Sequence, residues 1–444
     1  MRKLSRRHFF KLTGGSIAAL GLGGWTPGGT AAEGTAVVTR VVRRAPLPAP
    51  KGQRVVVVGG GWSGLTAAKY IKKEDPSLDV VLVERREIFV SSPISNLWYD
   101  GLVDFEFLTH SFLDAARHND YWFFSAMVID VDRDKRRVYT SDGYIDYDFL
   151  LLAPGIDYDY PRIGVEDPAD QFRLKTQYPG GFIPGSEDIT LMHKLEAFAS
   201  GDFLLTVPTG NYRCLPAPYE RTCLVADYFK RNRIGAKVVL LDGNPDITIK
   251  KAGFHQAFEE LYKDYVEYVP SFEITGVDVD RKRVRSEFGE RSFDDAALYP
   301  RVRASRLIER LGLVDPDSTQ KEARIDPFKY NVVGDERVYV AGDSRPMPYS
   351  KSGNTANSEA HHVAKVIAAR ANGKEVDWRS PHTVCYSVVA SEPMRAIMVD
   401  TYYAYDEEKK AFGFAKTRMD QEADRAKGLA TLEWARGLYR DMFS

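Results

Sequence analysis

A glycine motif between a short apolar run and a helix-forming stretch constrains the fold of this chain most strongly. Residues 54–58 are a β-branched run, Gly59-Gly60-Gly61-Trp62-Ser63-Gly64 follows, and residues 65–73 have helical character. The next apolar run, residues 80–83, ends at Glu84. Here Gly59 allows the tight turn, Gly61 lets the backbone approach a pyrophosphate, and Gly64 lets the helix pack on the strand. Since the helix N-terminus favours phosphate and Glu84 can accept from a ribose hydroxyl, the pattern predicts a dinucleotide-binding domain.

Two later segments indicate that the dinucleotide is FAD. Residues 147–155 form a predicted strand that ends in Ala153-Pro154-Gly155, and residues 338–343 form another that ends in Gly342-Asp343. Together with the glycine motif, these segments resemble the flavoprotein reductases that contain two dinucleotide folds. The resemblance implies that Asp343 holds the ribityl chain of the flavin. Taken alone, an aspartate at this place is also a cap for the following helix.

The other residues expected around the flavin belong to the glycine motif, to the loop after Glu84 and to the segments near the two strand ends. Lys351 is expected at the pyrimidine end of the flavin, with a solvated surface charge as its alternative interpretation. The predicted FAD contacts are Gly59, Gly61, Trp62, Ser63, Gly64, Glu84, Arg85, Ser92, Asn96, Val128, Ala153, Pro154, Gly155, Gly342, Asp343, Lys351, Ser352 and Gly353.

A second dinucleotide fold is expected in the middle of the chain, without its nucleotide fingerprint. Residues 203–207 and 237–242 read as strands and residues 219–230 as a helix. The turn after the first strand contains Cys214-Leu215-Pro216-Ala217-Pro218 instead of glycines. Side chains here block a pyrophosphate, and proline removes an N–H donor. The sequence therefore predicts that neither NADH nor NADPH is the electron donor.

The cysteines offer another route for electrons. Cys214 lies at a strand end, where active residues of α/β sheets are placed, and Cys385 follows the predicted flavin domain. A disulfide beside a flavin accepts two electrons from a sulfur nucleophile. From spacing alone, a structural disulfide is equally compatible with these two cysteines. Cys223, early in the predicted helix, is expected to be a packed core residue.

Three motifs resemble the flavoprotein subunit of flavocytochrome c sulfide dehydrogenase, a relative of sulfide:quinone oxidoreductase. They are residues 214–221 (Cys-Leu-Pro-Ala-Pro-Tyr-Glu-Arg), residues 350–358 (Ser-Lys-Ser-Gly-Asn-Thr-Ala-Asn-Ser) and residues 383–387 (Thr-Val-Cys-Tyr-Ser). The resemblance implies a redox disulfide between Cys214 and Cys385 that sulfide attacks. Electrons then pass to FAD and on to a c-type haem of a partner subunit or a soluble cytochrome c. Glu220 and Glu359 are candidates for proton transfer, with helix-surface charge as the alternative for each.

One position departs from the family. Its members often tether FAD through a cysteine just before the Ser-Asn pair of the flavin-side loop, where this chain has Ser92. A serine cannot form the thioether, so FAD is expected to bind noncovalently.

The expected architecture is α/β: a flavoprotein with two Rossmann-like dinucleotide-binding domains of the FAD/NAD(P) type and a C-terminal α+β domain. We place the discontinuous FAD domain at residues 53–162 and 288–375 and the second Rossmann-like domain at 163–287. Residues 376–444 are expected to cover the flavin and form a partner interface. Their tail, residues 421–443, has helical apolar spacing with mixed charge on the other side. A membrane-surface helix is usually more basic, which disfavours a quinone reductase.

The N-terminus resembles an export signal. Ser5-Arg6-Arg7 begins a twin-arginine pattern, an apolar stretch follows, and small residues end at Ala32. Residues 1–32 thus predict export of the folded protein to the periplasm, where disulfides persist. The formal net charge of −1 disfavours nucleic-acid binding, and no apolar run is long enough for an integral membrane span. No metal-ligand spacing stands out, and His361-His362 are expected to point in different directions.

Three functions remain open from the sequence. The first is a periplasmic sulfide dehydrogenase that reduces a cytochrome c. The second is a membrane-associated sulfide:quinone oxidoreductase. The third is a flavin-loaded redox or maturation partner of another periplasmic protein, such as a metalloenzyme.

Overall fold

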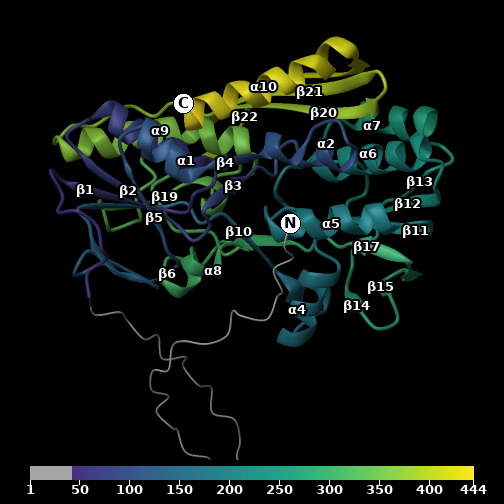
Figure 1. The fold of residues 1–444 in the computed structure, drawn as a ribbon, viewed down its shortest axis with the longest axis horizontal. Helices are drawn as coiled ribbons and strands as arrows, with labels where there is room; N and C mark the ends of the chain where they lie inside the picture. The colour runs from purple at the N-terminus through teal and green to yellow at the C-terminus, as the bar shows by residue number, and fades with distance from the viewer. Residues whose placement is uncertain (1–42) are drawn as a thin grey trace, which may run out of the picture. The chain divides into compact units, whose positions relative to one another are not determined.

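The computed structural model describes residues 43–444, so the predicted export signal lies outside the described residues. A five-stranded parallel sheet forms the first part (Figure 1). Its central strand β1 is buried at every position and pairs in parallel with both of its neighbours. A parallel sheet covered on both faces needs such continuous apolar runs, and each buried valine contributes about 1.5–3 kcal/mol. The strands, in sheet order, are β19 (Val338–Val340), β9 (Phe149–Leu152), β1 (Arg54–Val58), β2 (Asp79–Glu84) and β5 (Trp122–Ser125).

Two helices from distant parts of the sequence pack together on this sheet. They are α1 (Trp62–Glu74) and α9 (Gly353–Ala371), and the amide of Asn357 donates to the Thr66 hydroxyl over 2.8 Å. Smaller elements complete this part: β3 (Ile88–Val90), α2 (Ser95–Tyr99), β4 (Thr109–Ser111), α3 (Phe112–His118), β6 (Val128–Asp132), β7 (Arg137–Thr140), β8 (Gly143–Asp146) and α8 (Arg306–Arg310).

A second parallel sheet forms the centre of the chain. Its order is β13 (Val266–Val269), β12 (Gly235–Asp242), β11 (Ser200–Val207) and β17 (Asp295–Ala297). Helix α6 (Ala217–Arg231) connects β11 to β12 and buries Cys223 completely. The remaining elements are α4 (Pro168–Gln177), α5 (Ser186–Ala197), α7 (Lys251–Gln256), β14 (Gly276–Asp278), β15 (Arg283–Ser286) and β16 (Gly289–Ser292). The chain passes from the first part to the second through β10 (Ile156–Tyr158) and returns through β18 (Val302–Ala304). These two strands pair in an antiparallel arrangement.

The predicted return to the FAD domain at residue 288 is too early. Residues 286–289 form a hairpin turn between β15 and β16, and β17 then pairs in parallel with β11, Phe203 opposite Asp295. The central part therefore extends through residue 297. The polar hairpin resembles a linker in sequence. Only the pairing of the following strand β17 with the distant strand β11 shows that this segment belongs to the central part.

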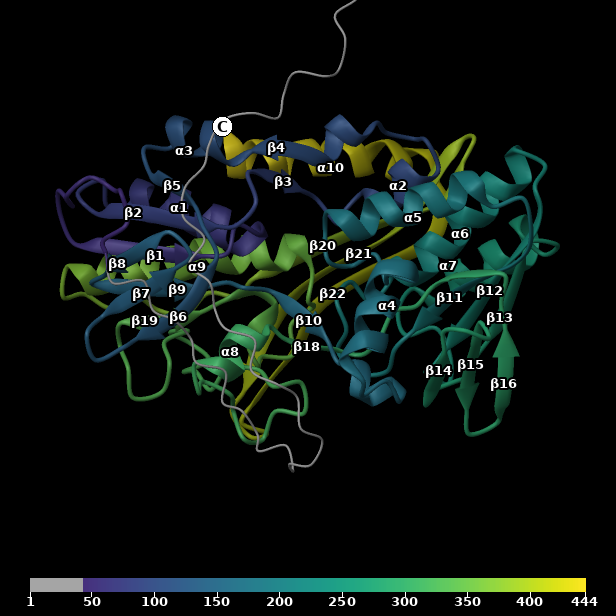
Figure 2. The same cartoon turned by 60° about the horizontal axis from the view of Figure 1, so that its bottom comes forward.

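A C-terminal antiparallel sheet spans both parts (Figures 1 and 2). It contains β20 (His382–Ser391), β21 (Met394–Asp406) and β22 (Ala411–Asp424), followed by α10 (Arg425–Phe443). Strand β20 contacts both α6 and α9, while α10 packs on α1. The helix begins later than predicted because β22 continues to Asp424, whose carboxylate caps the helix at the Lys427 N–H. No helix within residues 43–444 is long and apolar enough to cross a bilayer.

Candidate active site

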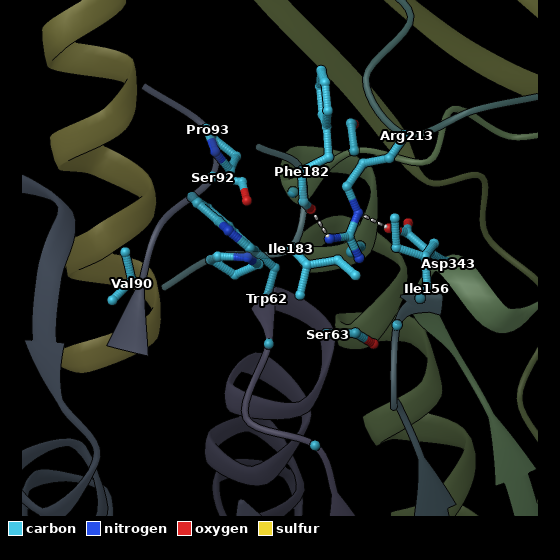
Figure 3. A pocket seen from close by; sticks show the side chains of 18 of the residues that line it. Trp62, Ser63, Val90, Ser92, Pro93, Ile156, Phe182, Ile183, Arg213 and Asp343 are labelled. Atoms are coloured by element: carbon cyan, nitrogen blue, oxygen red, sulfur yellow. Dashed lines mark hydrogen bonds and ion pairs between the residues drawn. The ribbon is translucent and has the colours of Figure 1, made fainter. Parts of the chain in front are cut away.

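A cavity of about 460 Å³ is lined by residues of both parallel-sheet parts and of the C-terminal sheet (Figure 3). This volume is within the range of about 300–1,000 Å³ that small-molecule and cofactor sites occupy. All of the predicted FAD contacts line it except Gly64 and Lys351. Cys214, Glu220 and Cys385 line the same cavity, so the predicted cofactor and sulfur sites are one continuous space.

The three motif glycines have different steric surroundings. A Cβ on Gly59, whose φ is +100°, would lie 2.4 Å from the Ala153 carbonyl oxygen, and one on Gly64 would lie 1.8 Å from the Gly59 carbonyl oxygen. Gly64 therefore packs α1 on β1 and does not face the cavity. A Cβ on Gly61 would meet nothing within 4 Å, because this backbone borders the open cavity. The backbone at Gly61 is thus free for close approach by a ligand.

Glu84 is fixed at the edge of the cavity by backbone and side-chain donors. Its carboxylate accepts from the Gly60 N–H over 2.8 Å and from the backbone N and Nε of Arg86, each over 3.0 Å. Burial opposes ionisation, but the charge and hydrogen bonds of Arg86 outweigh it and hold the Glu84 pKa below its usual value. Glu84 is therefore an ionised acceptor.

The thiols of Cys214 and Cys385 meet at the other end of the cavity. Cys214 follows β11 with a φ of +56°, and its N–H donates to the Lys351 carbonyl over 2.7 Å. Cys385 lies in β20, opposite Val399 of β21. Both cysteines are free thiols here, and the Cys214 thiol donates a hydrogen bond to Cys385. The fold thus brings together two thiols that are far apart in the sequence.

The two thiols differ in acidity. The hydrogen bond from Cys214, together with the nearby charge of Lys250, lowers the Cys385 pKa to about 6. Donating that bond, combined with burial, raises the Cys214 pKa. Cys385 therefore carries the negative charge of the reduced pair near neutral pH.

Glu220 of α6 lies beside the thiols. One carboxylate oxygen accepts from the Asn96 amide and the other from the Val388 N–H, over 2.8 and 2.7 Å. Burial, assisted by the charge of Cys385, raises the Glu220 pKa to about 7. A carboxyl group with this pKa can hold or release a proton at neutral pH.

Three sequence families match segments of this chain. The central region of the sulfide dehydrogenase [flavocytochrome c] flavoprotein chain matches residues 189–298. The flavin-binding region of flavocytochrome c sulphide dehydrogenase matches residues 380–443, and pyridine nucleotide-disulphide oxidoreductase matches residues 53–177. The flavoprotein chain of sulfide dehydrogenase from Chlorobaculum thiosulfatiphilum is 57% identical over 44 residues, which are 10% of this chain and 92% of that one. The chain is a relative of the flavocytochrome c sulfide dehydrogenase flavoprotein and of sulfide:quinone oxidoreductase.

Similarity to sulfide:quinone oxidoreductases extends over most of the chain. The mitochondrial sulfide:quinone oxidoreductase of Schizosaccharomyces pombe is 22% identical over 420 residues, covering 84% of this chain and 85% of that one. The structure of sulfide:quinone oxidoreductase from Aquifex aeolicus has a TM-score of 0.67 at 14% identity and covers 88% of this chain and 92% of that one. The predicted α/β flavoprotein fold is confirmed. The matches identify an FAD-dependent oxidoreductase related to sulfide dehydrogenase.

The cavity has the polar groups that FAD requires. Five buried side-chain atoms that line it have no hydrogen-bond partner within the described chain: Trp62 Nε1, Ser63 Oγ, Ser92 Oγ, Asp343 Oδ1 and Trp434 Nε1. Since an unpaired buried polar atom costs about 1–3 kcal/mol, these atoms fit a polar ligand. Gly61 offers backbone for the pyrophosphate, Glu84 an acceptor for a ribose hydroxyl, and Asp343 an acceptor for the ribityl chain.

Sequence reasoning missed Arg213. Its Nε donates to Asp343 Oδ2 over 2.6 Å, and its Nη1 donates to the Phe182 carbonyl over 2.7 Å (Figure 3). It therefore connects Asp343 to the loop of residues 180–185 that borders the cavity. Its position directly before Cys214 is the signal that identifies it.

Two predicted residues have other contacts. The Lys351 ammonium is completely buried away from the cavity, where it pairs with Glu322 over 2.5 Å and donates to the Asp343 carbonyl over 2.8 Å. The Glu359 carboxylate pairs with Arg345 over 3.0 Å and accepts from the Gly342 N–H. Lys351 is thus not a flavin contact through its side chain, and Glu359 is not the sulfur-side proton carrier. Both are used to hold the loops that border the cavity.

Lys250 is a further residue that the sequence did not identify. Its ammonium donates to Ser387 Oγ over 2.7 Å and to the Cys385 carbonyl over 3.1 Å, and it lies 3.7 Å from Cys385 Sγ. In sequence, Lys250-Lys251 resembles an exposed basic pair. Within residues 43–444, no group of three or more His, Cys, Asp or Glu side chains is arranged for a metal. His361 contacts Asp441, and His362 contacts the Phe328 carbonyl.

Proposed function

We propose that this protein oxidises sulfide through a redox pair formed by Cys214 and Cys385. The observation that carries the proposal is the meeting of these thiols in the cavity whose other end has the groups for FAD. In the oxidised pair, hydrosulfide attacks one sulfur, the S–S bond breaks, and a new S–S bond to the sulfide sulfur forms. The other cysteine leaves as a thiolate and keeps the electron pair. Bound FAD supplies the two-electron acceptor.

Glu220 is suited to the accompanying proton transfer. A pKa of about 7 allows this carboxyl to accept a proton as the persulfide ionises and to release it later. Asn96 and Val388 hold its two oxygens, which fixes the carboxyl beside the sulfurs.

We infer that nicotinamide coenzymes do not reduce this protein. Besides the proline-rich turn, the acid at the end of β12 is already used. In a dinucleotide fold this acid accepts from a ribose, but Asp242 Oδ2 accepts from the hydroxyls of Tyr219 and Tyr268, over 2.7 and 3.0 Å. Asn244 donates to the other oxygen.

The proposed electron acceptor is a c-type cytochrome, and the proposed location is the periplasm after export of the folded protein. The match to two regions of flavocytochrome c sulfide dehydrogenase supports the cytochrome, and the twin-arginine pattern supports the location. Quinone is the alternative acceptor, favoured by similarity to two mitochondrial sulfide:quinone oxidoreductases over 84% and 81% of this chain. Ser92 supports noncovalent FAD, since the chain has three cysteines and none in this loop.

The test is an anaerobic absorbance titration of the purified holoprotein with sulfide, with NADH as the control. We expect sulfide to bleach the flavin and NADH to leave it oxidised. Cys214→Ser and Cys385→Ser variants should retain FAD but lose bleaching, whereas Cys223→Ser should bleach normally. Normal bleaching in both active-site variants would exclude the disulfide mechanism. Cytochrome c reduction without lipid would then distinguish the cytochrome from the quinone acceptor.

A further inference from the structure

Lys250 is a buried cation whose contacts are concentrated at one of the two cysteines. Only 1% of this residue is exposed, and its ammonium is enclosed by the Cys385–Ser387 segment of β20. Among residues 43–444, it forms no ion pair with a carboxylate; its acceptors are a carbonyl, a hydroxyl and a sulfur. An ammonium buried among neutral acceptors is costly unless an anion accompanies it.

The backbone at Lys250 holds the side chain in place at an energetic cost. Its φ and ψ are +54° and +36°, a left-handed conformation that costs a non-glycine residue about 1–2 kcal/mol. Lys250 also precedes α7 directly, and its carbonyl accepts from the Phe254 N–H over 3.2 Å. The next residue, Lys251, pairs with Asp246 at the surface, its side chain 59% exposed. The two adjacent lysines therefore have opposite surroundings.

We propose that Lys250 is a catalytic residue that holds the sulfur of Cys385 as an anion, so that hydrosulfide attacks Cys214. In disulfide exchange the sulfur that forms the more stable thiolate is the better leaving group. Hydrosulfide bonds to Cys214 Sγ, the Cys214–Cys385 bond breaks, and the electron pair remains on Cys385 Sγ beside the ammonium. The products are a Cys214 persulfide and a Cys385 thiolate, with no net change in charge.

The other titratable groups around Cys385 agree with this direction. Cys214 donates its hydrogen bond toward Cys385, and the Cys385 pKa is lowered to about 6. Glu220 opposes a negative sulfur when it is ionised, but its raised pKa of about 7 leaves it largely protonated in slightly acidic solution. Lys250 is therefore the positive charge of the group formed by Cys214, Glu220, Lys250 and Cys385.

The inference rests on the proposed function, but its first test does not need sulfide. Holoprotein reduced with dithiothreitol is alkylated with iodoacetamide from pH 5 to 9, and labelling of each cysteine is followed by peptide mass spectrometry. For wild type and the matched control Lys251→Met, we expect the Cys385 rate to rise with a midpoint near pH 6. Lys250→Met should move this midpoint upward by one unit or more, which slows labelling at pH 6 at least about fivefold, and Lys250→Arg should largely restore it. Cys223, completely buried, reports unfolding because it should stay unlabelled in every folded variant.

An unchanged midpoint in Lys250→Met would overturn the proposal. If that variant does not fold, a wild-type midpoint above pH 8 would overturn it equally.

A second test locates the sulfur atom that sulfide adds to the protein. Oxidised holoprotein receives one equivalent of sulfide, is quenched with iodoacetamide, and is mapped by mass spectrometry. We expect the extra sulfur on Cys214, and finding it on Cys385 would refute the direction of attack. The expected alkylation profile without flavin bleaching by sulfide would overturn the proposed function and its catalytic step, while the stabilisation of the Cys385 thiolate by Lys250 would stand.

Discussion

Ionisation of Glu220 should destabilise the folded protein, and Glu220→Gln should remove that effect. The pKa of about 7 in the folded protein lies above the ordinary value of 4.5, so the folded state binds the proton more tightly than the unfolded chain. The stability that this proton contributes is complete below pH 4.5 and is lost as the pH rises through 7. Two and a half pKa units at about 1.36 kcal/mol each give a total loss of about 3.4 kcal/mol.

Most of this loss falls within an accessible pH range. By linkage, the wild-type penalty is about 0.8 kcal/mol at pH 5 and about 3.4 kcal/mol at pH 8.5, a difference of about 2.5 kcal/mol. Glutamine loses the hydrogen bond from Asn96, which costs about 1 kcal/mol, but this cost is the same at both pH values. The stability of Glu220→Gln relative to wild type should therefore rise by about 2.5 kcal/mol between pH 5 and pH 8.5.

Urea denaturation at the two pH values measures this difference. Glu196→Gln, at an exposed position of α5, serves as the matched control and should show no such rise. A relative stability of Glu220→Gln that is constant from pH 5 to pH 8.5 would refute the assignment of a raised pKa to this carboxyl.

Two further predictions follow from the steric surroundings and polar groups of the cavity. Gly64→Ala should abolish FAD retention, measured as the flavin-to-protein ratio, because its Cβ would lie 1.8 Å from the Gly59 carbonyl oxygen. Gly437→Ala in α10, where a Cβ meets nothing within 4 Å, should retain FAD and raise stability by about 0.5–1 kcal/mol. Ser92→Cys should keep flavin fluorescence on the protein after acid precipitation, whereas wild type should release it. Release from Ser92→Cys would show that residue 92 does not reach the flavin.

Local sequence patterns predicted the parts of the fold that depend on neighbouring residues. The glycine motif specifies its own turn, since Gly59 and Gly64 exclude a Cβ by contacts within or near the motif. Continuous apolar runs indicated β1 and β11 because parallel strands are buried on both faces. The family motifs placed Cys214 and Cys385 in the same site.

Features that depend on distant contacts were not predictable in this way. Lys250 contacts Cys385, which is 135 positions away in the sequence. The sequence Lys250-Lys251 does not indicate which of the two lysines is buried. Lys351 and Glu359 lie in the expected segments, but Glu322 and Arg345 attract their charges away from the cavity. The domain boundary near residue 288 was misplaced because β17 is identified by its pairing with β11.

The second Rossmann-like part explains how a sulfur site can replace a coenzyme site without a change of fold. The turn after β11 still lies at the carboxyl end of a parallel sheet, where ligands of α/β proteins bind. Here that turn is fixed to the flavin-binding part, because the Cys214 N–H donates to the Lys351 carbonyl. This backbone hydrogen bond holds Cys214 at the edge of the cavity. Restoring glycines to the turn would not restore coenzyme binding, because Tyr219 and Tyr268 would still occupy the ribose-binding oxygen of Asp242. The positioning of Cys214 and the proposed exclusion of nicotinamide coenzymes would therefore be two consequences of the same local structure.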